Sequence, residues 1–132
     1  MILLDTSALI EFLNRTGSRH DRAVEDLILN DTDIAIAEIT LTEVLQGIRS
    51  ERDYREVKAS LITLPTLSLK NQDSYIKAAD IYRKCRSKGF TIRSTVDLLI
   101  AQTAIENNAE ILHNDRDFEA IASVSSLRNY HI

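Results

Sequence analysis

The chain has 132 residues, of which 44% are hydrophobic and 27% are charged, a composition typical of one ordinary globular domain. No apolar run approaches the ~18 residues that a membrane helix needs, and the apolar start meets Asp5 at once, so we expect neither a membrane anchor nor a signal peptide. The 16 basic and 20 acidic residues give a formal net charge of −4, which argues against a protein that coats nucleic acid generally. The single cysteine, Cys85, cannot form an internal disulfide and fits a reducing cytoplasm.

Strand-like and helix-like patterns alternate along the chain. Short apolar runs predict strands, and longer stretches with apolar residues three and four apart predict helices. In the first half, the predicted elements are a buried strand at 2–5, a helix over 8–13, a loop at 14–18, a helix around 23–28, a strand at 34–37, a helix from Thr40 or Leu41 to Gly47 or Ile48, and a helix at 51–64. In the second half, they are a strand at 66–69, a long helix at 71–88 closed by Gly89, a helix at 94–107, a strand at 110–113, a short helix at 118–122 and an edge strand at 127–132.

This alternation decides the fold class. Strands separated by helices predict an α/β fold whose central, mostly parallel sheet of about five strands is covered by helices on both faces. No linker, repeat or low-complexity tract divides the chain, so we expect one domain over residues 1–132.

Four acidic residues lie where a strand-like run gives way to a helix-like one. They are Asp5, Glu43, Asp97 and Asp115. In an open α/β sheet, ligands bind outside the carboxyl ends of the strands, so these side chains should converge there. Carboxylates crowded together repel one another unless a divalent cation lies between them. Oxygen ligands alone suit Mg²⁺ or Mn²⁺, and the three histidines of the chain lack the spacing of a zinc site.

Each acid taken alone also fits the start of a helix. Thr40 with Glu43, and Ser94 with Asp97, match the capping box, in which the carboxylate bonds back to the backbone of the cap residue. Asp5 and Asp115 fit plain N-caps in the same way. Two observations favour a joint site: all four acids share one position relative to the strands, and a charge at the end of a buried strand is costly unless it is paired or metal-bound.

Four segments of the chain, in this order, resemble a known family. They are Ile-Leu-Leu-Asp-Thr-Ser-Ala-Leu-Ile from position 2, Thr-Glu-Val-Leu-Gln-Gly from 42, Arg-Ser-Thr-Val-Asp-Leu-Leu-Ile-Ala from 93 and His-Asn-Asp-Arg-Asp-Phe from 113. Together they resemble a PIN domain of the VapC toxin type, and the likeness spans essentially the whole chain. It implies a three-layer α/β/α sandwich and a Mg²⁺-dependent endoribonuclease. We expect Mn²⁺ to be able to replace Mg²⁺, since oxygen ligands suit both. The likeness also implies a cytoplasmic protein that forms a homodimer or a hetero-oligomer with a cognate antitoxin.

The resemblance also assigns roles to individual residues. Asp5, Glu43, Asp97 and Asp115 match the acids of the family, and we expect Asp5, Asp97 and Asp115 to hold one or two Mg²⁺ ions, directly or through water. Thr6 matches a small hydroxyl position beside the first acid, and Asp117 matches an additional acid that some members use. His113 departs from the Thr or Ser common two residues before the fourth acid. Candidate contacts to the RNA backbone are Arg15, Arg19 and Arg93.

The expected reaction is hydrolysis of an RNA phosphodiester bond by water that the metal activates, with Glu43 completing the site or orienting that water. Two other hypotheses remain open. One is a phosphotransferase or phosphatase that forms an aspartyl-phosphate on Asp5, although that chemistry favours a second acid where this chain has Ser7. The other is a PIN-like module without catalysis, whose acidic pocket only docks a basic partner.

Overall fold

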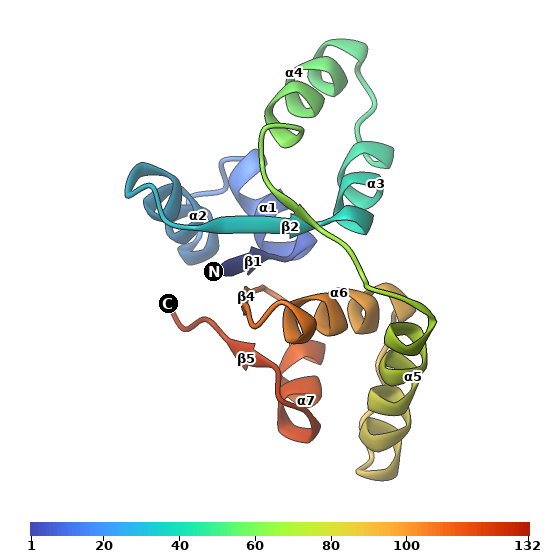
Figure 1. Ribbon diagram of the computed structural model, residues 1–132. Coiled ribbons are helices and arrows are strands. Elements are labelled where there is room, and N and C mark those ends of the chain that lie inside the picture. Colours follow the sequence, from blue (N-terminus) through green and yellow to red (C-terminus); the bar gives the residue numbers. More distant parts are fainter.

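Five strands, all parallel, form the centre of the protein in the computed structural model, which describes residues 1–132 (Figure 1). Their order across the sheet is β3-β2-β1-β4-β5. The strands are β1 (Ile2–Leu4), β2 (Ile34–Ala37), β3 (Thr66–Leu67), β4 (Glu110–Leu112) and β5 (Arg128–Asn129). The predicted α/β fold is therefore confirmed, and no strand runs against the others.

Seven helices cover the two faces of this sheet. They are α1 (Thr6–Leu13), α2 (Arg19–Leu29), α3 (Glu38–Gln46), α4 (Glu51–Leu61), α5 (Gln72–Ser87), α6 (Thr95–Glu106) and α7 (Asp117–Val124). Helices α1 to α4 and helices α5 to α7 form two groups on the two sides of the strands, which gives the three layers (Figure 1). No helix is both long and apolar enough to span a membrane.

The central strand divides the hydrophobic core into two parts. Successive side chains of a strand point to opposite faces, so Leu3 packs with α5, α6 and α7 while Ile2 and Leu4 pack with the first four helices. Phe118 and Leu3, both fully buried, anchor the first part. A strand that is buried on both faces reads as a continuous apolar run, which explains why the sequence revealed β1 so plainly.

Some predicted boundaries were wrong. Helix α3 begins at Glu38 rather than at Thr40 or Leu41, and its N-cap, Ala37, makes no side-chain capping bond. Capping chemistry therefore does not set its start, and the helix follows directly from β2. The last strand is only Arg128–Asn129, because β5 pairs with β4 along just two residues.

The topology creates one point where the strand order reverses. The chain proceeds from β1 outward to β2 and β3, and then returns to β4 on the other side of β1. Ligands of open α/β sheets bind outside the carboxyl ends of the strands at such a reversal. Asp5 directly follows β1 and Asp115 comes three residues after β4, so the fold brings two of the predicted acids to this point.

Candidate metal centre

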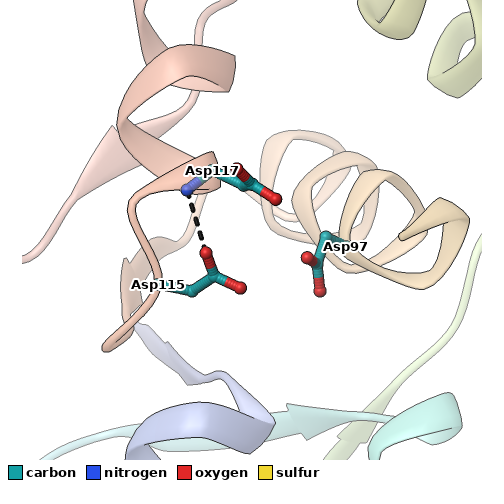
Figure 2. A group of neighbouring side chains, drawn as sticks. All are labelled: Asp97, Asp115 and Asp117. Atoms are coloured by element: carbon teal, nitrogen blue, oxygen red, sulfur yellow. Dashed lines mark hydrogen bonds between the residues drawn. The ribbon is translucent and has the colours of Figure 1, made fainter. Parts of the chain in front are cut away.

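Three carboxylates lie closest together at the reversal point. Asp97, Asp115 and Asp117 each offer an oxygen, and these oxygens all lie within 4.8 Å of one another. Asp97 comes from the first turn of α6, Asp115 from the segment that joins β4 to α7, and Asp117 is the first residue of α7 (Figure 2). The sequence proposed Asp117 only as an additional acid, whereas the structure places it in the tightest group.

Asp5 lies at the same end of the sheet and is 3% exposed. It is the N-cap of α1, as the simple interpretation of the sequence predicted, because its Oδ2 accepts hydrogen bonds from the Ser7 backbone N–H at 3.0 Å and from the Ser7 hydroxyl at 2.5 Å. Its other oxygen, Oδ1, is buried and has no hydrogen-bond partner. A buried carboxylate oxygen without a partner is costly, so capping alone does not account for Asp5.

Glu43 approaches the site from α3. It lies in the second turn of that helix and not at its start, so the predicted capping box with Thr40 is wrong. Its Oε1 instead accepts a hydrogen bond of 2.7 Å from the Thr6 hydroxyl, which joins the start of α1 to α3. Thr6, whose hydroxyl the resemblance matched beside Asp5, therefore holds the side chain of Glu43 in place.

Arg93 is the basic partner of the cluster. Its Nη2 donates to Asp115 Oδ1 at 2.9 Å, while its Nε and its backbone N–H both donate to Asp117 Oδ2 at 3.2 Å. These contacts raise the pKa of the Arg93 guanidinium, chiefly through the hydrogen bond to Asp117. Arg93 was predicted to contact the RNA backbone, and the structure shows its guanidinium engaged with two carboxylates of the site.

The carboxylates share a pattern of hydrogen bonding. Asp5, Glu43, Asp115 and Asp117 each accept protein hydrogen bonds through one oxygen only. Asp97 accepts none, so the reciprocal bond of a capping box with Ser94 is absent, although Ser94 does cap α6 through the Val96 N–H. One oxygen of each held carboxylate orients the side chain and the other stays free, as in metal ligands fixed by an outer shell of hydrogen bonds.

Crowding and burial shift the protonation of this cluster. Burial raises the pKa of Asp97 to about 7, and the negative charges of Asp5, Asp115, Glu43 and Asp117 add to the effect in that order. Burial likewise raises the pKa of Asp5, against the opposing hydrogen bonds from Ser7. All four of the other carboxylates therefore lie within electrostatic reach of Asp97. A divalent cation would relieve both the repulsion and the unpaired oxygen of Asp5, so the residues fit such an ion.

His113 stabilises the turn that carries Asp115. Its Nδ1 accepts the backbone N–H of Asp115 at 3.1 Å, its Nε2 lies 3.4 Å from Glu119, and its ring packs on Phe118. Burial lowers the pKa of His113, which favours the neutral ring that can accept at Nδ1. The histidine therefore holds the backbone of Asp115 through a ring nitrogen.

Two of the predicted RNA contacts lie away from the carboxylates. Arg15 lies two residues beyond the end of α1, and the eight residues of that helix carry it about 12 Å from the site where α1 begins. Arg19 is the first residue of α2 and lines a separate hollow with Tyr130 and Ile132.

Sequence reasoning missed one residue of the site, Ser7. Its hydroxyl donates to Asp5 and accepts the backbone N–H of Asn114 at 2.8 Å. The only signal for it was its place two residues after an aspartate, where local side-chain to backbone bonds form.

Comparison with known proteins places this geometry in a family. The family described as PIN domain matches residues 2–124. This chain belongs to the PIN domain family. It is 36% identical to VapC ribonuclease Mb1587 of Mycobacterium bovis and to ribonuclease VapC11 of Mycobacterium tuberculosis, over 97% of this chain and 96% of each relative.

Solved structures share the fold of this PIN domain. The VapBC2 complex of Rickettsia felis, solved with a DNA fragment from its promoter, has a chain that superposes with a TM-score of 0.75 at 24% identity, covering 99% of this chain and 100% of that one. A toxin–antitoxin complex from Klebsiella pneumoniae gives a TM-score of 0.71 at 21% identity, with full coverage of both chains. At such identities the likeness establishes the three-layer fold, and the family assignment rests on the sequence matches.

Proposed function

We propose that this PIN domain is the toxin of a toxin–antitoxin pair, a Mg²⁺-dependent endoribonuclease in which residues 1–132 act as one domain. The observation that carries the proposal is the convergence of five carboxylates, each with at least one free oxygen, from four separate segments of the chain. The relatives at 36% identity are named VapC ribonucleases, which supports RNA as the substrate. Mn²⁺ should be able to take the place of Mg²⁺, since both prefer oxygen ligands.

The free oxygens suggest which residues hold the cation. Asp97 has two of them, and Asp5 and Asp115 have one each, so these three would bind the ion directly or through water. Asp117 lies close enough to join them, with Arg93 holding its other oxygen. When bound, the ion would lower the pKa of water and stabilise charge on the phosphoryl oxygens during in-line displacement.

Glu43 is suited to orienting the attacking water. Thr6 fixes Glu43 through one carboxylate oxygen, which leaves the second oxygen to accept a hydrogen bond from water. Attack by water breaks the bond between phosphorus and the 3′ oxygen, so the products carry a 5′-phosphate and a 3′-hydroxyl. A nuclease that used the RNA 2′-hydroxyl would leave a cyclic phosphate.

A cleavage assay tests this proposal. Purified protein with Mg²⁺ should cut single-stranded RNA, and removal of the metal with a chelator should stop the reaction. Asp5→Asn should reduce the rate more than about 100-fold, because losing a ligand should exceed the 10- to 100-fold effects typical of outer-shell partners. Asp80→Asn on the exposed face of α5 is the matched control and should keep wild-type activity. Equal cleavage by the Asp5→Asn variant, or cyclic-phosphate ends, would refute the mechanism.

Two further experiments separate the other hypotheses. A phosphotransferase would form a covalent phosphate on Asp5, but Oδ2 of that residue is held by Ser7 and its Oδ1 is buried. A module without catalysis would bind its partner without cutting any RNA. Trapping with a small phosphate ester detects the first case, and intact RNA beside a bound partner indicates the second.

We further propose that a cognate antitoxin inhibits the site electrostatically. Solved neighbours of the same fold are toxin–antitoxin complexes, which supports a partner of this kind and a homodimeric or hetero-oligomeric assembly in the cytoplasm. An Arg or Lys of the antitoxin placed among Asp5, Asp97 and Glu43 would take the role of the cation. Replacing that basic residue in a co-purified complex should restore cleavage, and unchanged inhibition would contradict the idea.

A further inference from the structure

A hollow of about 590 Å³ opens beside the carboxylates, between the loop that joins α5 to α6 and the start of α7. Arg93 and Asp117 line it and also belong to the metal centre, so the two sites are continuous. Its other walls include Phe90, Arg116 and Glu119. Three of its ten lining residues are hydrophobic, against eight of fourteen in the hollow between α1, α2 and α4.

Phe90 lines this hollow from a hydrogen-bonded turn. Helix α5 ends in a Schellman motif, in which the Gly89 N–H donates to the Arg86 carbonyl at 3.0 Å and the Phe90 N–H donates to the Cys85 carbonyl at 2.9 Å. Gly89 permits this turn because its φ is +87°, a conformation that costs other residues strain. The turn thus fixes the backbone of Phe90, whose side chain is 44% exposed, whereas Phe118 is fully buried.

Arg116 supplies an uncommitted positive charge to the same hollow. Its side chain is exposed and makes no hydrogen bond or ion pair within the protein. The nearby carboxylates already have partners, since Asp117 is bound by Arg93 and Glu119 lies against His113. A guanidinium without a carboxylate partner, in the same hollow as an exposed aromatic ring, is suited to a phosphate next to an unpaired base.

We propose that this hollow binds one unpaired nucleotide of the RNA substrate, with its base stacked on Phe90 and its phosphate at Arg116. The inference rests on the proposed function, because it extends the path of the RNA away from the carboxylates. We choose RNA as the ligand because proteins recognise single-stranded RNA by stacking its splayed bases on aromatic side chains. In this subsite Arg116 supplies the positive charge for the phosphate, although the chain as a whole carries a net charge of −4.

Photochemical cross-linking tests the position of the base directly. The wild-type protein is mixed, without divalent metal, with a single-stranded oligoribonucleotide carrying iodouridine, irradiated and digested with trypsin. Cleavage after Lys88 and Arg93 releases Gly-Phe-Thr-Ile-Arg, in which Phe90 is the only aromatic residue. The control is Tyr75, which is 55% exposed and falls in the separate tryptic peptide from Asn71 to Lys77.

The inference predicts cross-links in the Phe90 peptide and none in the Tyr75 peptide. Equal labelling of both peptides, or labelling of the Tyr75 peptide alone, would overturn it. If the antitoxin shields the Phe90 peptide while RNA never cross-links there, the hollow belongs to a protein partner, and this result would also overturn it. Because no cleavage is needed, cross-linking at Phe90 by a protein that fails to cut RNA would support the subsite and count only against the proposed hydrolysis.

Kinetics give a second, independent test. Phe90→Ala should raise KM for RNA by roughly 5- to 100-fold, the range for losing one base–aromatic stack, and leave kcat nearly unchanged. Phe90→Trp should retain wild-type KM, because it keeps the stacking surface. Tyr75→Ala is the control and should leave both constants as they are. A fall in kcat with unchanged KM, or no rescue by tryptophan, would contradict a role in binding the base.

Discussion

Replacing Asp97 with asparagine should stabilise the protein when no divalent cation is present. The pKa of Asp97 is about 7 in the folded protein against an ordinary value of 3.8, so the folded state holds its proton more tightly than the unfolded state does. Stability is therefore lost as the pH rises from about 4 to 7, and the loss is complete above that range. Asparagine carries no charge at any pH, so the variant does not lose this stability. The difference in free energy of unfolding between Asp97→Asn and the wild type should therefore grow as the pH rises from about 4 to 7.

The size of the effect follows from the same values. The difference between the two pKa values corresponds to at most about 4 kcal/mol, and partial solvent exposure of Asp97 reduces this to about 1–2 kcal/mol. For a chain of 132 residues, such a gain raises Tm by roughly 3–8 °C at pH 8. Adding Mg²⁺ should reverse the order, because a ligand that binds only the folded wild type stabilises it by about 2.7 kcal/mol at 100 times its Kd.

Thermal unfolding of chelator-treated protein at several pH values measures this directly. Asp53→Asn is the matched control, because Asp53 occupies the same third position of α4 and is exposed. It should lower stability by about 0.3–1 kcal/mol, since it only loses a favourable interaction with the helix dipole. If Asp97→Asn behaves like Asp53→Asn in the absence of metal, the argument from crowded carboxylates is refuted.

Three further predictions concern the site and the core. The apparent affinity for Mg²⁺, measured by calorimetry, should fall about tenfold from pH 8 to pH 6, because the ionised fraction of Asp97 falls from about nine tenths to about one tenth; a flat profile would contradict its pKa. Thr6→Val should lower kcat about 10- to 100-fold by releasing Glu43, while Thr6→Ser keeps the hydroxyl and should retain activity; equal losses in both would exclude the hydrogen bond as the cause. Phe118→Ala should cost about 3–5 kcal/mol in denaturant unfolding, because the ring is fully buried, and a cost below about 1 kcal/mol would show that this core is not tightly packed.

The fold was predictable because its local signals agree with one another. The run Ile2–Leu4 is apolar throughout, and a strand buried on both faces requires this. Predicted element boundaries were wrong where packing, and not local capping chemistry, sets the start of an element. Helix α3 begins at Glu38 without any capping side chain, so the capping motif around Thr40 pointed to the wrong residue.

The sequence predicted which acidic residues come together at the site, but it did not predict the hydrogen bonds that they make. The positions of Asp5, Asp97 and Asp115 after strands or at helix starts indicated convergence, because parallel strands share one carboxyl edge. The pairing of Arg93 with Asp115 and Asp117 joins residues 22 and 24 positions apart, and no local pattern encodes a bond of that kind. The same holds for Phe90 and Arg116, which meet at one hollow only because α5 packs against α7.

The most direct test of the account is a crystal structure of the protein soaked with Mn²⁺, in which the anomalous signal locates the cation. The account predicts a Mn²⁺ ion held by Asp97 and Asp115, directly or through water, with the free oxygen of Asp5 facing it. Arg93 should remain bound to Oδ1 of Asp115 and Oδ2 of Asp117, the oxygens that it contacts without the ion. If saturating Mn²⁺ bound elsewhere and left no ion between these carboxylates, the claim that they form a metal centre would be contradicted.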